Sequence, residues 1–303
     1  MNSLKTYSHL DSARKIPSDY EVASTDLLYY LRRGFEVETP VMDWYKTYQQ
    51  KSPLKCSDWE RFSDPRATTY SSYVTLQNQK EIFTSQLFDT VGAGGKESLP
   101  PHWKGEVLHT AGCLRFLFHG LQMVAAYVGQ MAPSSKITIV CAFQAADELR
   151  RVNHFSYKLA MAGGLQAQDE VKRIWMADPA WQPLRRLVEE LLVVYDWGEA
   201  FAALNLAVKP KIDVLLEKFR AFAKANDRHS FAEIIGSQLE DSKWHMTWSQ
   251  ALKEVLIKDN RENETILARW VQNWEEKAAG AVNDVVNGWT LKESHEHSSI
   301  DAN

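Results

Sequence analysis

The chain has 303 residues, of which 45% are hydrophobic and 24% are charged. This length suits one large domain or two small ones, and the apolar share is enough for a sizeable core. A formal charge of −4, from 35 Lys and Arg against 39 Asp and Glu, does not supply the basic face that a nucleic-acid partner demands. Three cysteines, far apart and odd in number, argue against a disulfide framework and against a cysteine-ligated zinc site.

The chain opens without an apolar stretch of signal-peptide length, so we expect a protein of the reducing cytoplasm. Residues 108–131 are rich in Leu, Phe, Met, Val and Ala, but His109, Arg115 and His119 interrupt them. A membrane-spanning helix needs about 20 consecutive, predominantly apolar residues. The segment therefore predicts a buried helix and no membrane partner.

Residues 1–75 are expected to form an extended N-terminal arm. They hold twelve of the 34 aromatic residues, and proline and turn-type residues repeatedly interrupt them. Disordered segments are poor in aromatics, so the arm is expected to be ordered by packing on something. It could wrap its own domain or grip a partner subunit, because aromatics are enriched at interfaces. The candidate interface residues are Trp44, Tyr45, Tyr48 and Trp59.

From residue 76 onward, helical spacing of apolar residues dominates. The first helix is expected over 75–91 and is followed by a glycine-rich turn at 92–95. Further helices are expected over 103–131, 136–162, 167–176, 183–207, 211–226, 228–257 and 264–290. Ser134 or Ser135 is a plausible N-cap for the helix over 136–162, and Pro210 is expected to end the helix that begins at Pro183. The fold class is therefore all-α, a bundle of long helices over 76–290, with a flexible polar tail at 291–303.

Three positions in the predicted helices carry ligand-type side chains on apolar faces: Glu148, Glu199 and His245. A di-iron bundle needs a lone Glu from each of two helices and a Glu-x-x-His pair from each of two others. Here Arg151 stands where the His after Glu148 is needed, and Ser242 stands where the Glu before His245 is needed. Each half-motif has thus kept one ligand and lost the other.

The fourth helix fails as well, because it offers Leu121 and Gln122 near its middle instead of Glu. Two carboxylates and one His cannot hold two iron ions. The residues instead predict a structural polar network, in which Arg150 or Arg151 pairs with Glu148 or Glu199.

Two alternatives stay open. One Glu-x-x-His pair is intact, at Glu106 and His109. In the first alternative, the chain is a stand-alone di-metal oxidase that uses this pair together with Glu148, Glu199 and His245. In the second, it is a helical adaptor unrelated to oxygenation.

Several segments, in order along nearly the whole chain, resemble one protein family. They are Thr6–Leu10, Pro17–Val22, Trp44–Tyr48, Ser52–Lys55, Asp58-Trp59, Asp64-Pro65, Tyr127–Pro133, Asp196–Phe201, Leu204–Leu206 and Lys209-Pro210. In these segments the chain is similar to the β subunit of the hydroxylase component of bacterial multicomponent di-iron monooxygenases, in the toluene, alkene and isoprene branch. Residues 24–40 and 66–100 depart from the pattern, so the resemblance does not fix the substrate.

The resemblance implies a ferritin-like fold without metal in this chain, and no catalytic or cofactor-binding residue. The di-iron centre would lie in a partner α subunit, which hydroxylates or epoxidises aromatic or alkene hydrocarbons with O2. The implied partners are the α and γ subunits, a second β subunit in an (αβγ)2 assembly, and a small effector protein. A Rieske-type ferredoxin and a reductase would deliver electrons from NADH through iron–sulfur clusters and FAD.

Overall fold

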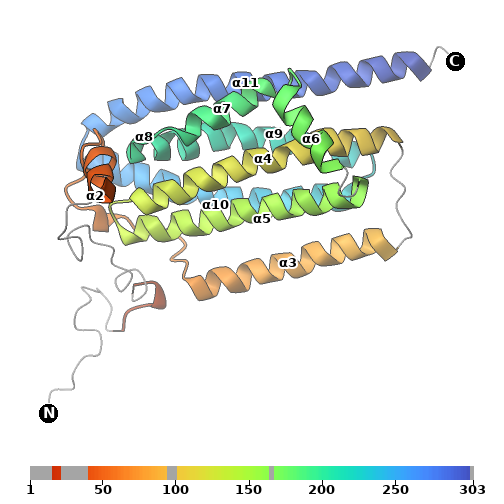
Figure 1. The fold of residues 1–303 in the computed structure, drawn as a ribbon. Helices are drawn as coiled ribbons and strands as arrows, with labels where there is room; N and C mark the ends of the chain where they lie inside the picture. Colours follow the sequence, from red (N-terminus) through yellow and green to blue (C-terminus); the bar gives the residue numbers. More distant parts are fainter. Residues whose placement is uncertain (1–15, 22–39, 94–100, 164–166, 301–303) are drawn as a thin grey trace.

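The computed structural model describes residues 16–21, 40–93, 101–163 and 167–300, and every regular element within these ranges is helical (Figure 1). The all-α prediction is confirmed. The long helices are α3 (Tyr70–Ala93), α4 (Pro101–Met131), α5 (Ser135–Gly163), α9 (Lys209–Ala225), α10 (His229–Asp259) and α11 (Glu262–Ile300). The shorter ones are α2 (Pro40–Tyr45), η1 (Lys46–Gln50), η2 (Trp59–Arg61), α6 (Ala167–Ala177), α7 (Gln182–Leu192), α8 (Trp197–Phe201) and η3 (Ala202–Val208).

A hairpin of α4 and α5 forms the front of the bundle in Figure 1, and the two helices pack together along their length. Their connection is short, and Ser134 Oγ accepts a hydrogen bond from the backbone N–H of Lys136 at 3.2 Å. This bond satisfies one of the free N–H groups at the start of α5, so the predicted cap is confirmed. Behind the hairpin, α9 packs on α10, and α11 crosses η3, α7 and α9.

One continuous hydrophobic core fills the space between the helices, with Trp197, Trp248 and Phe118 fully buried in it. Within α4, the stretch Thr110–Met131 is long and apolar enough to cross a membrane by length and composition. Most of it is buried inside the bundle, as a core helix of a globular protein would be.

The prediction of one helix over 183–207 is wrong, because the helical structure is interrupted between α7 and α8. Asp196 caps α8 by accepting the backbone N–H of Glu199 at 3.0 Å, and its Oδ1 also accepts from Ser52 Oγ at 2.8 Å. After the break, α8, the π-helix η3 and α9 follow one another without a gap, so Pro210 lies within the first turn of α9 and does not end a helix.

The described part of the predicted arm packs on its own bundle. Phe62 and Leu54 are buried, Tyr45 donates its hydroxyl to the carbonyl of Gln130 at 3.0 Å, and Gln49 Nε2 donates to the carbonyl of Met131 at 2.8 Å. These bonds fix the segment on the end of the bundle where α4 turns into α5.

Two helices of the structure extend across the predicted domain boundaries. The helix α3 begins at Tyr70, inside the predicted arm, and α11 continues to Ile300, inside the predicted tail. No proline or glycine follows Gly288, so nothing in the sequence interrupts the helical backbone there.

Candidate functional site

Glu148 on α5 lies fully buried between two cationic side chains. Arg151 Nη1 lies 3.2 Å from Glu148 Oε2, and Lys209 Nζ lies 2.5 Å from Glu148 Oε1. Burial raises the pKa of Glu148, but Arg151 and Lys209 outweigh it and hold the pKa below its ordinary value. The predicted pairing of Arg151 with Glu148 is confirmed, and Lys209 is a member of the site that the sequence did not reveal.

Arg151 also bridges from α5 to α10. Its Nη2 donates to the carbonyl of Gln238 at 2.7 Å and to Ser242 Oγ at 2.6 Å. Ser242 in turn donates to Asp213 Oδ1 on α9 at 2.7 Å, and the guanidinium carbon lies 5.3 Å from the centre of the Phe118 ring. The Ser at the position where a ligand Glu is needed therefore serves as an acceptor for the guanidinium.

His245 on α10 is buried beside the same carboxylate. Its Nε2 lies 2.9 Å from Asp147 Oδ2, and its Nδ1 lies 3.9 Å from Glu148 Oε1 with no hydrogen-bond partner. Burial lowers the pKa of His245 well below its ordinary value, and the charge of Lys209 lowers it further. The ring is therefore neutral at pH 7.

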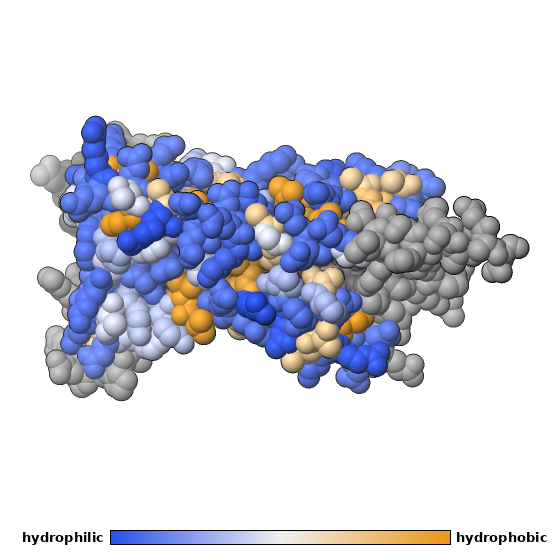
Figure 2. Space-filling view, turned by 90° about the horizontal axis from the view of Figure 1, so that it is seen from above, coloured by the Kyte–Doolittle hydropathy of each residue, from blue (hydrophilic) through white to orange (hydrophobic). Residues whose placement is uncertain are grey.

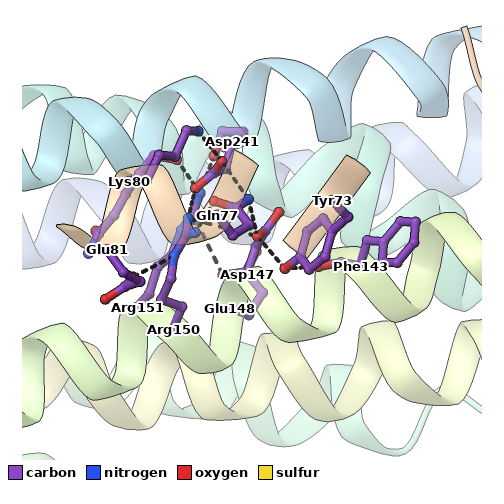
Figure 3. Close-up of polar contacts among 12 residues, drawn as sticks. Tyr73, Gln77, Lys80, Glu81, Phe143, Asp147, Glu148, Arg150, Arg151 and Asp241 are labelled. Atoms are coloured by element: carbon purple, nitrogen blue, oxygen red, sulfur yellow. Dashed lines mark hydrogen bonds and ion pairs between the residues drawn. The ribbon is translucent and has the colours of Figure 1, made fainter. Parts of the chain in front are cut away.

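A second polar layer attaches α3 to the bundle, as Figure 3 shows. Tyr73 donates to Asp147 Oδ1 at 2.7 Å, and Gln77 Nε2 donates to the same oxygen at 2.8 Å. Asp241 on α10 accepts from Lys80 and from Arg150. Polar side chains of α3 thus face the bundle, together with the rings of Tyr73 and Phe88, which pack against Phe143 and Tyr157 of α5.

Glu199 lies outside the cluster, so the prediction that groups it with Glu148 is wrong. It is half-buried on α8 and accepts a hydrogen bond from Trp274 Nε1 at 3.0 Å. Lys209, ten residues later in the chain, lies at the start of α9 and contacts Glu148 instead.

The α4 helix contributes no ligand to the cluster. Leu121 is fully buried in the hydrophobic core, and Gln122 is half-buried. Glu106 and His109 lie on α4, but their side chains fall outside the described part of the chain.

The donor set does not fit a di-iron centre. In the parts of the chain that the structure describes, no group of three or more His, Cys, Asp and Glu side chains could hold a metal ion. The two positions beside Glu148 that cations would occupy are filled by the Arg151 guanidinium and the Lys209 ammonium.

The four candidate interface residues divide into two groups. Tyr45 is buried, and Trp59 packs edge-on against Trp197 with ring centres 5.2 Å apart, so both belong to the protein's own core. Trp44 is 39% exposed and forms an aromatic cluster with Tyr48 and Tyr195, whose ring centres lie 4.5 and 5.0 Å from that of Trp44. Tyr195 comes from the break before α8, which the sequence did not predict.

Comparisons with known proteins place this fold among bacterial hydroxylases. A family model described as methane/phenol/alkene hydroxylase matches residues 44–260. The toluene-4-monooxygenase system hydroxylase component subunit beta of Ectopseudomonas mendocina is 35% identical over 284 residues, 89% of this chain and 86% of that protein. The methane monooxygenase component A beta chain of Methylosinus trichosporium is 22% identical over 258 residues, 78% of this chain and 64% of that protein.

Solved structures agree with these matches. A chain of toluene 4-monooxygenase, solved with toluene bound in the resting active site, superposes with a TM-score of 0.85 at 32% identity, covering 95% of this chain and 98% of that chain. A chain of the phenol hydroxylase of Pseudomonas sp. OX1 also superposes with a TM-score of 0.85, covering 95% of this chain and 90% of that chain. At 22% identity, the second likeness shows the fold alone.

Proposed function

Because the chain belongs to the methane/phenol/alkene hydroxylase family, as a β-type subunit of a multicomponent monooxygenase, we propose that it builds the hydroxylase without carrying the chemistry itself. The observation behind this proposal is that Glu148 is paired with two cationic side chains. Arg151 and Lys209 neutralise this buried carboxylate, so no charge is left over for a metal ion. The di-iron centre would then belong to a larger α subunit.

The relatives suggest the class of reaction. Their names refer to toluene, phenol, propane and methane as substrates of the parent monooxygenases. The assembled enzyme is proposed to insert one oxygen atom of O2 into an aromatic or alkene hydrocarbon with electrons from NADH. Its assembly would be (αβγ)2, served by an effector protein, a Rieske-type ferredoxin and an FAD-containing reductase. A cytoplasmic location is part of this proposal.

The alternative of a stand-alone di-metal oxidase requires Glu148, Glu199 and His245 to share one site. Glu199 instead bonds Trp274, and none of the described contacts joins it to Glu148. The proposed set of ligands is therefore split between two places in the bundle.

One face of the bundle supports a role in assembly. The exposed residues of α4 from 110 onward and of α5 up to 160 form one stripe on each helix, and none of them is Lys, Arg, Asp or Glu. They are His119, Met123, Ala126 and Gln130 on α4, and Ala142, Ala146, Leu149, Asn153, Tyr157 and Ala160 on α5. We refer to these ten residues as the uncharged face.

The side of the protein that carries α11 is built differently. Seen from the α11 side, the surface is mostly hydrophilic, with small separate hydrophobic areas (Figure 2). Exposed positions of α11 include Glu264, Arg269, Glu276 and Lys277. Interface cores are depleted of charged residues, so the uncharged face is proposed as the surface on which the larger subunit packs.

Iron analysis tests the proposed division of labour. The chain purified without partners is expected to hold no tightly bound iron, and the assembled hydroxylase is expected to hold two iron ions for each larger subunit. Near-stoichiometric iron in this chain alone would refute a non-catalytic role. A native purification that recovers no larger partner would refute membership of a complex.

A further inference from the structure

Three buried polar side chains of the bundle find no hydrogen-bond partner among the residues that the structure describes. They are Gln144 on α5, Asn205 in the π-helix η3 and Trp248 on α10. Both the nitrogen and the oxygen of each amide are affected, and so is the indole Nε1 of Trp248. Buried polar groups are almost always bonded to protein or to ordered water, so these atoms require an explanation.

The two amides lie at one level of the bundle. Lys209 Nζ lies 2.5 Å from Glu148 Oε1, which fixes the level of η3 and α9 against α5. Asn205 and Gln144 each stand four residues before these two partners, about one helical turn away. The segment from η3 to α9 runs in the same direction as α5 (Figure 1). Both amides are therefore displaced from the charged pair toward the same end of the bundle.

Trp248 reaches this level from the third helix. His245 Nδ1 lies 3.9 Å from Glu148 Oε1, which fixes the level of α10 against α5. The helix α10 runs in the opposite direction to α5 (Figure 1). Trp248 follows His245 by three residues, so it is displaced toward the same end of the bundle as Gln144.

The fourth helix contributes only a small side chain here. A Cβ atom on Gly129 of α4 would lie 2.8 Å from Cβ of Cys141 on α5, so these two positions face each other. The two helices are antiparallel, so Ala125, one turn before Gly129, faces the level of Gln144. Ala125 is buried, and its single methyl group leaves room for a molecule as small as water.

We infer that Gln144, Asn205 and Trp248 hold an internal water site between α5, η3 and α10. Each amide offers donors and an acceptor, and the indole N–H is a donor only, so the set can bond both the hydrogens and the oxygen of water. A buried water makes about three hydrogen bonds to groups that otherwise lack a partner. The three side chains carry no charge, which favours a neutral ligand over an ion.

A crystal structure of the assembled hydroxylase, at a resolution that shows ordered water, tests the site directly. We expect solvent density within hydrogen-bond distance of at least two of the three side chains, in every copy of this chain. Amides that bond each other directly, or a level without solvent density, overturn the inference.

Unfolding of the complex gives a second readout in solution. Gln144→Met removes the amide and nearly keeps its shape. If water satisfies the amide, the midpoint should fall, as it should for Gln49→Met, whose amide donates directly to two backbone carbonyls. A midpoint at or above that of the wild type would show that the Gln144 amide is buried without a partner, because losing such a group relieves a cost. That result contradicts the inference.

The two amides should also depend on each other. Asn205→Leu alone should lower the midpoint, and the double variant with Gln144→Met should lose less than the two single losses together, because both amides bind the same water. Strictly additive losses would show that the two side chains share no ligand, which overturns a common site.

Discussion

At the scale of single residues, the stability of the charged cluster depends on the buried carboxylate of Glu148. Removing charges from water is costly, and their mutual attraction repays that cost only with good geometry and further hydrogen bonds. Arg151 meets this condition through Gln238 and Ser242, and Lys209 lies at hydrogen-bond distance from the carboxylate. The carboxylate and its two cations stabilise one another, so removing the carboxylate alone should cost more than removing it together with one cation.

A double-mutant cycle measures this balance. Glu148→Gln leaves the Arg151 and Lys209 cations buried without their main partner and should cost about 3–5 kcal/mol of unfolding free energy. Adding Lys209→Met removes one of the stranded charges and should recover a large part of that loss. The readout is the urea unfolding midpoint of the complex. A double variant no more stable than Glu148→Gln would contradict the electrostatic account.

The neutral state of His245 predicts a pH dependence. The pKa of His245 is lowered in the folded protein, so the unfolded chain binds more protons below its ordinary value of 6.5. Stability should therefore fall as the pH drops below 6.5, with a slope of up to about 1.4 kcal/mol per pH unit from this group. Asp147, Glu148 and Lys209 surround the ring, so the slope is measured as a difference between wild type and His245→Asn.

Unfolding at pH 7.0, 6.0 and 5.0 provides that difference. The wild type should lose more stability than His245→Asn across this range. The matched control is His229→Asn, which changes a 71% exposed side chain and should leave the slope unchanged. Equal slopes for wild type and His245→Asn would show that the buried ring is not the group responsible.

The pair of Glu148 and Arg151 was predictable because its members are three residues apart on one helix and share a face. The role of Lys209 was not, since it lies 61 residues from Glu148 and depends on where the fold places the start of α9 relative to α5. Residue types alone identified the lost ligands, but they did not identify the side chain that replaced them.

At the scale of elements, the largest departure from the sequence prediction is the segment from α7 to α9. Apolar spacing continues from 183 to 207, so periodicity alone predicts one helix. The break depends on Asp196, whose carboxylate is shared between a local backbone N–H and the distant Ser52.

Pro210 was expected to end a helix, because proline lacks an N–H and clashes with the carbonyl four residues earlier. The π-helix η3 ends at Val208, and Pro210 is tolerated because it lies in the first turn of α9.

Close packing of α4 on α7 depends on Gly120. A Cβ atom at this position would lie 2.3 Å from Cγ1 of Val188, whose branched side chain has little freedom to move. Gly120→Ala should therefore destabilise the protein by about 1–3 kcal/mol through overpacking, less the helical gain of alanine.

The matched control is Gly280→Ala on α11, where a Cβ atom would meet nothing within 4 Å. There the helical preference of alanine acts alone and should stabilise by about 0.5–1 kcal/mol. Thermal unfolding midpoints of both variants give the comparison. A Gly120→Ala midpoint at or above that of wild type would show that α4 and α7 can separate at little cost.

At the scale of the whole molecule, the fold class was predictable because long helices with few prolines leave a strong periodic signal. The attachment of α3 was not, because it depends on Asp147 and Asp241, two acidic residues on different helices. The uncharged face also becomes visible only in three dimensions, when the exposed stripes of α4 and α5 are compared with those of other helices.

Ala146→Arg tests that face as the contact with the larger subunit. Ala146 is an exposed member of the stripe on α5, so the fold should tolerate a long side chain there. In the assembled hydroxylase, the guanidinium would be buried against a surface selected for uncharged contact, and an unpaired buried charge is expensive. We expect the variant to keep its helical content and to lose most co-purification with the larger subunit.

Ala221→Arg on α9 is the matched control, because its exposed neighbours Glu217, Lys218 and Lys224 form an ordinary charged surface. It should co-purify as the wild type does. Undiminished recovery of the larger subunit with Ala146→Arg would place the contact elsewhere on the molecule. The cluster of Trp44, Tyr48 and Tyr195 would then become the principal candidate, because Trp44 and Tyr195 expose aromatic surface to solvent there.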